Sequence, residues 1–214
     1  MQQFLIEHGQ TVVFIGDSIT DAGRRAEHAP FGAGYVRMAI DLITARYPER
    51  QITYFNEGIG GNTVADLHAR WEQDGLAHSP DWISIMIGIN DLHRVLRDDP
   101  TAVPPEQYET LYREILQQAE RATSARFVLL DPFYICKPEE AGEWEKSVLD
   151  LLDQYIEIVE RLAGEFDALH VPTHQRFQEH LKYRPASHFC PEPVHPNPSG
   201  HMVIALSLVE ALQW

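Results

Sequence analysis

The sequence has few cysteines, few basic residues and no long apolar run. Cys136 and Cys190, the two cysteines among 214 residues, are too few for a disulfide framework, and neither has a neighbour at metal-ligand spacing. We therefore expect two free thiols. Residues 1–7 lack the basic segment and apolar stretch of a secretion signal, and no segment is long enough to cross a bilayer. These absences predict a cytoplasmic protein that does not insert into membranes.

Positive charge is scarce: 17 Lys and Arg stand against 32 Asp and Glu, which gives a formal net charge of -15. Nucleic acids and anionic membranes are recognised through basic surfaces, so neither is expected as a partner. The same charge disfavours polyanionic substrates and favours a neutral one. A local basic pocket around Arg24 or Arg94 would reverse this near a site.

The eleven histidines form no metal-binding motif. His170 and His174 have the i, i+4 spacing of helical ligands, but Pro172 between them breaks that geometry, and no His-Glu-x-x-His or paired-cysteine motif occurs. We therefore expect no metal and no cofactor. His93 and His188 are interpreted as pocket walls or surface residues.

Alternating strand and helix patterns run through the whole chain, without a linker or an internal repeat, and predict one domain over residues 1–214. Apolar, β-branched stretches predict strands at 11–15, 51–55, 82–87, 126–131 and 168–171. Amphipathic stretches predict helices at 31–47, 63–74, 105–121, 140–162, 174–183 and 199–212. Strands joined by helical crossovers imply a five-stranded parallel sheet covered on both faces, which is a three-layer α/β/α sandwich.

Ser18 follows the first predicted strand, in the segment Gly16-Asp17-Ser18-Ile19-Thr20. Ligands of open α/β sheets bind at the carboxyl ends of strands, so this serine stands where a nucleophile belongs. Near a helix N-terminus, backbone N–H groups and the helix dipole could also stabilise an oxyanion. The alternative is that Asp17 and Ser18 only cap a helix, since both residue types are favoured at that position.

Three further segments supply the other parts of a serine hydrolase. A glycine-rich loop at residues 56–63 follows the second strand and can offer bare N–H groups. Asn90 follows the third strand with an amide that can donate hydrogen bonds. Near the carboxyl end, Glu192 precedes His195 by three residues, within reach of its imidazole. These segments complete a nucleophile, a base, an orienting carboxylate and oxyanion donors.

The order and content of these blocks resemble the SGNH, or GDSL, hydrolase superfamily over nearly the whole chain. The resemblance implies a flavodoxin-like fold, with Ser18 as nucleophile and His195 as general base and acid. It also implies an oxyanion hole formed by the Ser18 N–H, the Gly61 N–H and the Asn90 side chain. Asp17 and Asp91 are expected to support the nucleophile turn and the Asn90 loop. Further segments resemble small bacterial acetyl xylan esterases, namely 14–21, 61–64, 69–71, 80–82 and 132–134.

Glu192 departs from the superfamily pattern, which has aspartate three residues before the histidine. A Glu carboxylate can replace that of Asp if the backbone accommodates one more methylene. We assign Glu192 as the orienting acid. Two alternatives stay open: a backbone carbonyl holds His195 in a dyad, or Glu192 is a solvated loop residue.

Three functions compete. The first is an esterase that removes acetyl groups from xylose-based oligosaccharides, and the second is a general short-chain carboxylesterase, lysophospholipase or thioesterase. The third is a catalytically silent binding module. The chain-end Trp214 could pack on its own domain or on a neighbour. We favour the neighbour and expect a homo-oligomer. Trp71, Trp82 and Phe133 are expected to be core residues rather than sugar platforms.

Overall fold

A computed structural model describes residues 4–214 and contains one parallel sheet of five strands in the order β2-β1-β3-β4-β5. The strands are β1 (Thr11–Gly16), β2 (Thr53–Gly58), β3 (Trp82–Met86), β4 (Arg126–Leu130) and β5 (Leu169–Val171). β1 and β3 are almost wholly buried because they are apolar on both faces, as central parallel strands must be. Four of the predicted strands begin within a residue of their expected starts. The 51–55 strand instead covers Thr53–Gly58, because its pairing with β1 sets its limits.

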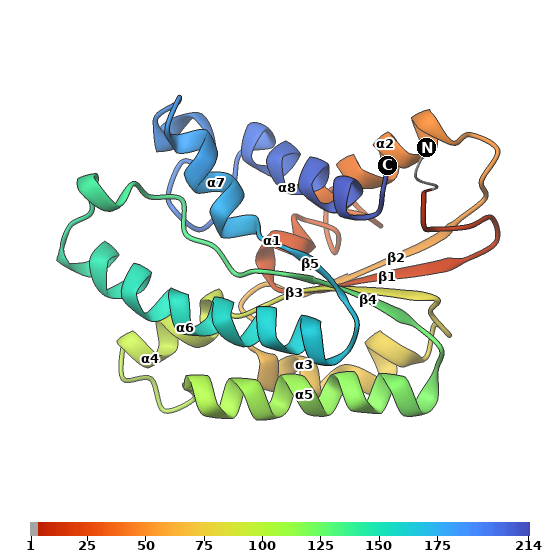
Figure 1. Ribbon diagram of the computed structural model, residues 1–214, viewed down its shortest axis with the longest axis horizontal. Helices are drawn as coiled ribbons and strands as arrows, with labels where there is room; N and C mark the ends of the chain where they lie inside the picture. The colour runs from red at the N-terminus through yellow and green to blue at the C-terminus, as the bar shows by residue number, and fades with distance from the viewer. Residues whose placement is uncertain (1–3) are drawn as a thin grey trace.

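Helices cover both faces of this sheet, which confirms the predicted α/β/α sandwich (Figure 1). One layer holds α1 (Ser18–Asp21), α2 (Tyr35–Arg46), α7 (Thr173–Leu181) and α8 (Pro198–Ala211). The other layer holds α3 (Val64–Arg70), α4 (Ile89–Leu96), α5 (Pro105–Ala122) and α6 (Glu143–Glu165). A π-helical segment, Trp71–Leu76, extends α3, and short 3-10 turns lie at Pro138–Glu140 and Ala186–His188.

Some helix limits differ from the predicted ones. The 31–47 helix begins only at Tyr35, after a loop, and α6 covers Glu143–Glu165 rather than 140–162. Thr63 caps α3 in a capping box with Asp66, at the start of the predicted 63–74 helix. The sequence analysis missed α4, since its eight residues follow a buried strand directly and its Gly88 N-cap resembles a turn.

The carboxyl ends of β1, β2 and β3, which are neighbours in the sheet, are level. Gly16 at the end of β1 pairs with Gly58 of β2 and with Met86 of β3. The segments that follow these strands therefore leave the sheet at one edge. This register brings the Ser18 turn, the glycine-rich loop and Asn90 to the same place.

The core on both sides of the sheet contains the aromatic residues that the sequence assigned to it: Trp71, Trp82 and Phe133 are at most 1% exposed. Cys136 and Cys190 are buried free thiols, as expected. Within residues 4–214, no helix is both long and apolar enough to cross a membrane.

Trp214 packs against other residues of its own chain. Its indole lies against the guanidinium of Arg46 at the end of α2, with the carbon of that group 4.6 Å from the ring centroid. It also packs against the hydrophobic core. These contacts place Trp214 on its own domain, and its role at an interface and the homo-oligomer stay predictions.

Candidate active site

The turn after β1 presents Ser18 at the sheet edge. Gly16 is needed for close approach, because a Cβ at this position would lie 2.3 Å from the backbone oxygen of Met86. Asp17 caps the turn, and its Oδ1 accepts a hydrogen bond from the Ile19 N–H at 2.9 Å. Ser18 is the first residue of α1, which has only four residues. The expected contribution of a helix dipole is therefore small, since aligned peptide units build that field.

A chain of hydrogen bonds runs from Ser18 to Glu192. Ser18 Oγ lies 2.9 Å from His195 Nε2, and His195 Nδ1 lies 2.5 Å from Glu192 Oε1. An ionised carboxylate only accepts hydrogen bonds, so Nδ1 carries the proton and Nε2 is free to accept the Ser18 hydroxyl. The structure thus brings together the three residues that the sequence proposed, and Glu192 faces the imidazole rather than turning away to solvent.

The Glu192 carboxylate is held by its own loop. Besides His195 Nδ1, it accepts the backbone N–H of Val194 at 3.0 Å and that of His195 at 2.8 Å. Partial burial acts to raise the pKa of Glu192, but these hydrogen bonds outweigh it and keep the pKa below its usual value. The carboxylate is therefore charged at neutral pH, as a group that must balance an imidazolium needs to be.

The glycine-rich loop lies beside Ser18. A Cβ on Gly60 would lie 3.7 Å from the Ser18 Cβ, and the next residue, Gly61, has a φ of +82°, a value that favours glycine. Among residues 4–214, the N–H groups of Ser18 and Gly61 have no recorded hydrogen-bond acceptor. Asn90 Nδ2 donates one hydrogen bond, to the Asn62 carbonyl at 3.0 Å, which leaves its second N–H for another acceptor.

Helix α4 holds the glycine-rich loop in place through three side chains. Besides the bond from Asn90, Asp91 Oδ1 accepts the Val64 N–H at 3.0 Å, and Arg94 donates to the Gly61 carbonyl at 2.9 Å. Asp91 thus ties α4 to the start of α3. The short helix that the sequence analysis missed positions the predicted oxyanion loop.

Arg70 is a second support that the sequence analysis did not assign. Its guanidinium donates to Asn62 Oδ1 at 2.8 Å and to the Gly16 carbonyl at 3.2 Å, and it pairs with Asp74 at 2.9 Å. It therefore links the glycine-rich loop to the nucleophile turn. The sequence signals were its place in the segment 69–71, which resembles acetyl xylan esterases, and its position on the helix two turns after Thr63.

Two buried carboxyl groups lie behind these loops. Burial raises the pKa of Asp17 to about 6, and the hydrogen bond from Ile19 and the charge of His195 limit the rise. Burial raises the pKa of Asp91 to about 7, against the hydrogen bonds from Val64 and from its own backbone. Asp91 Oδ2 is buried and has no hydrogen-bond partner among the described residues.

Asp91→Asn should make stability less dependent on pH. The Asp91 pKa is raised on folding, so its contribution is fully present below the unfolded value near 4 and is lost as pH rises through about 7. The amide oxygen of Asn can still accept the Val64 N–H. We expect the melting temperature of the variant, relative to the unmodified protein, to rise between pH 4 and pH 8. Thermal denaturation across that range tests this, and a constant difference would show that Asp91 does not titrate there.

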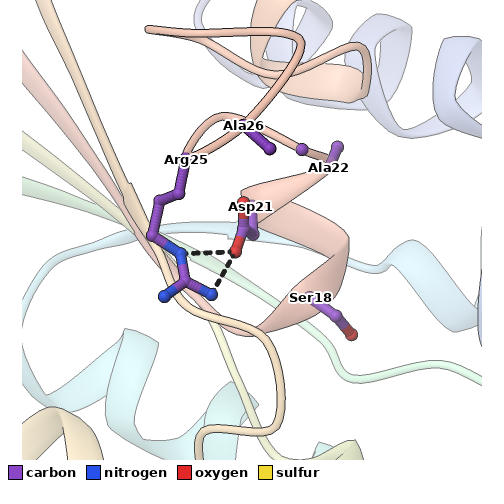
Figure 2. Close-up of a pocket in the computed structure, with 6 residues that line it drawn as sticks. Ser18, Asp21, Ala22, Arg25 and Ala26 are labelled. Carbon is purple, nitrogen blue, oxygen red and sulfur yellow. Dashed lines mark hydrogen bonds and ion pairs between the residues drawn. The ribbon is translucent and has the colours of Figure 1, made fainter.

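A pocket of about 420 Å³ opens beside Ser18, along residues 18–26 (Figure 2). Arg25 forms an ion pair with Asp21 at 2.9 Å on one side of it, and Figure 2 shows the Ser18 side chain pointing away from that pair. The small side chains of Ala22 and Ala26 form part of its lining. The pocket provides room for part of a substrate next to the serine.

Other sequence candidates fall outside this hydrogen-bonded group. Arg24 is bound to Glu57 at 3.0 Å and to the Gly58 carbonyl, so it offers no free positive charge. His93 lies one helical turn after Asn90, which fits its interpretation as a wall. His188 packs against Phe189 in the turn before the catalytic loop.

Comparisons with known proteins agree with this geometry. A curated acetylxylan esterase from Geobacillus stearothermophilus is 38% identical over 216 residues, which cover 97% of this chain and 95% of that protein. Three solved structures of catalytic mutants of Axe2, an acetylxylan esterase from the same organism, have a serine, an aspartate or a histidine replaced by alanine. They are 36–37% identical to this chain, with TM-scores of 0.88 or 0.89, over 98% of this chain and 97% of theirs.

Another solved structure is that of LAE5, described as an alpha/beta hydrolase enzyme from the metagenome of Lake Arreo, Spain. LAE5 is 31% identical to this chain, and the two structures superpose with a TM-score of 0.88. The match covers 99% of this chain and 98% of LAE5. A model of the GDSL-like lipase/acylhydrolase family matches residues 14–203, a range that includes every residue of the candidate site. With a serine, a histidine and a carboxylate in one hydrogen-bonded series at the carboxyl edge of the sheet, the chain belongs to the GDSL-like lipase/acylhydrolase family.

Proposed function

We propose that this protein is a serine esterase that removes O-acetyl groups from xylose-based oligosaccharides. The observation that carries the proposal is the hydrogen-bonded series of Ser18, His195 and Glu192. The likeness to acetylxylan esterases over nearly the full chain supports the substrate class. The net charge of -15 agrees with a neutral sugar ester rather than a polyanion.

In the first half of the reaction, Ser18 Oγ attacks the acetyl carbonyl while His195 Nε2 takes the hydroxyl proton. The positive charge that forms on the imidazole is balanced by Glu192 across the short hydrogen bond from Nδ1. His195 then returns the proton to the leaving sugar oxygen. The products are the free sugar hydroxyl and an acetyl ester on Ser18.

In the second half, water replaces the sugar. His195 Nε2 removes a proton from the water, whose oxygen attacks the acetyl carbon, and the same proton then returns to Ser18 Oγ as acetate leaves. His195 is half exposed, with 57% of its side chain open to solvent, so water can reach the imidazole without a conformational change.

The oxyanion that forms in both halves is assigned to the N–H groups of Ser18 and Gly61 and to the Asn90 amide. The free donors of these groups support the assignment. Asp17 and Asp91 are assigned as structural supports of the nucleophile turn and of the glycine-rich loop. No metal or cofactor is required by these steps.

Asn90→Ala should lower kcat by roughly 100-fold, with a smaller change in KM, because the amide acts on charge that develops only in the transition state. Steady-state kinetics with an aryl acetate measures both constants. Because Asn90 also binds the Asn62 carbonyl, a thermal denaturation control should accompany the assay. A higher KM with unchanged kcat would make Asn90 a substrate-binding residue instead.

The substrate class is tested by comparing acetylated xylo-oligosaccharides with aryl esters of increasing acyl length. The proposal expects kcat/KM to be higher for the acetylated sugars and to fall steeply beyond acetyl. Equal or higher turnover of longer acyl chains would favour a general carboxylesterase, lysophospholipase or thioesterase. No turnover of any ester, and no labelling by a serine-directed phosphonate, would indicate a binding module.

Four finer expectations belong to this proposal. The whole chain is taken as one catalytic domain, the protein as a homo-oligomer and its location as cytoplasmic, without nucleic-acid or membrane partners. Light scattering after size-exclusion chromatography measures the subunit number. Cell fractionation of the producing organism tests the location.

A further inference from the structure

Trp144 is a large apolar side chain that the proposed reaction does not use and that the fold leaves exposed. Trp144 is 38% exposed. Among the described residues, the other large hydrophobic side chains that are exposed are those of Tyr183 and Leu206. Trp144 is the second residue of α6, after the loop that leaves β4. An exposed indole offers a flat apolar face to any ligand bound beside it.

A contact with His93 places Trp144 beside the candidate active site. The indole centroid lies 6.0 Å from that of the His93 ring, and His93 follows Asn90 by one turn of α4. Figure 1 shows α4 next to the first turns of α6. Residues three apart on a helix share a face, so Trp144 packs on the side of α4 that also carries Asn90.

The loop before α6 gives an independent connection. Ile135 N–H donates to the Pro193 carbonyl at 2.8 Å, which fixes this loop against the segment that carries Glu192 and His195. The preceding residue, Tyr134, meets the His93 ring edge to face, with centroids 6.1 Å apart. A series of contacts therefore connects Trp144, through His93 and the loop before α6, to the loop that carries Glu192 and His195.

One side of the indole is backed by α4. His93 packs at a tilt of 32°, and the guanidinium carbon of Arg97, four residues later, lies 5.5 Å from the ring centroid. Both neighbours belong to the same face of one helix. The exposed part of the indole is therefore the side turned away from α4, and the packing behind it limits its freedom to move.

We propose that Trp144 is a stacking platform for a pyranose ring of the substrate, next to the ring that carries the scissile acetyl group. This inference rests on the proposed function and names a specificity-determining residue for it. The axial C–H groups of a xylose ring form an apolar face that carries partial positive charge, which suits the negative face of an indole. The sugar hydroxyls point outward at the ring edge, where they stay hydrated.

A long acyl chain is a poorer occupant of this surface. The indole is bordered by the charged Arg97, and 38% of the residue is open to solvent. An acyl chain gains little from a platform that stays half in water, whereas a sugar needs one apolar face and keeps its hydroxyls hydrated. The surface thus favours an oligosaccharide over a lipid.

The test compares Trp144→Ala, Trp144→Phe and the control Leu206→Ala. Leu206 is 37% exposed and lies on α8, in the opposite helical layer (Figure 1). KM is measured for an acetylated xylotetraose and for 4-nitrophenyl acetate, which has no second sugar ring. We expect Trp144→Ala to raise the KM for acetylated xylotetraose, divided by the KM for 4-nitrophenyl acetate, about fivefold to tenfold. Trp144→Phe should bring this ratio back close to that of the unmodified protein. Leu206→Ala should leave the ratio unchanged.

An equal rise of KM for both esters would overturn the proposal, since it would indicate a structural role. An unchanged ratio would overturn it as well. If the unmodified protein does not turn over the acetylated sugar, the proposed function fails, and the platform is then tested by binding alone. Calorimetric titration of Ser18→Ala with unacetylated xylotetraose should show affinity that is lost in the Ser18→Ala, Trp144→Ala double variant, and the absence of any such difference would refute the platform.

Discussion

Ser18→Ala should lower kcat by about 10⁶-fold, because it removes the only oxygen that can form the acyl-enzyme in the proposed mechanism. The hydroxyl makes one recorded hydrogen bond, to His195, and alanine is tolerated at the first position of a helix. The fold should therefore persist. Steady-state turnover of an aryl acetate measures the loss, and circular dichroism with thermal denaturation verifies folding.

Ser124→Ala is the matched control for this experiment. Ser124 is exposed and lies just before β4, at the opposite end of the sheet from Ser18. The control should keep full activity and react with a serine-directed phosphonate, whereas Ser18→Ala should not be labelled. If Ser18→Ala kept even a tenth of the activity, Ser18 would not be the nucleophile.

Glu192→Gln should lower kcat by up to about 10⁴-fold, the scale seen when the acid of a Ser-His-Asp triad becomes an amide. Glutamine has nearly the same shape, but its NH₂ group can donate to His195 Nδ1 and stabilise the tautomer that carries its proton on Nε2. It also cannot balance the imidazolium charge. The pH profile of kcat should change together with its magnitude, and Glu139→Gln, at an exposed position of the 3-10 turn, is the control.

Glu192→Asp should keep partial activity. The shorter side chain restores the residue usual in the superfamily and retains the charge, but the loop is built around three hydrogen bonds to a longer side chain. Near-full activity in Glu192→Gln would support the dyad alternative, in which the orientation of His195 does not depend on this carboxylate.

Local patterns were enough to predict the class of the fold. The strands at Thr11–Gly16 and Trp82–Met86 are buried on both faces, so their uninterrupted apolar sequences identify them without any tertiary information. α5 matched its predicted range to within a residue, because Pro105 marks its start and its apolar spacing is regular. α4 was missed because eight residues are too few to establish a helical period next to a strand.

The candidate residues could also be identified from the sequence, since each lies at a strand end or in a motif whose residue types suit the reaction. The hydrogen bonds between them could not be predicted. Glu192 could have faced solvent, a backbone carbonyl or His195, and only the path of the loop settled that its carboxylate meets Nδ1. The supports from Arg70 and Arg94 were equally hidden, because each depends on contacts across 33 or more residues of sequence.

The sequence by itself determined that this chain forms a parallel α/β sandwich with a serine, an amide and a histidine at strand ends, because those features depend on residues close together along the chain. Only the tertiary structure decided the strand order, the hydrogen bonds from α4 that hold the glycine-rich loop, and the placement of Trp144 beside His93. It also turned Trp214 back onto Arg46 of its own chain. These contacts join distant segments, and their energies depend on packing that no local pattern encodes.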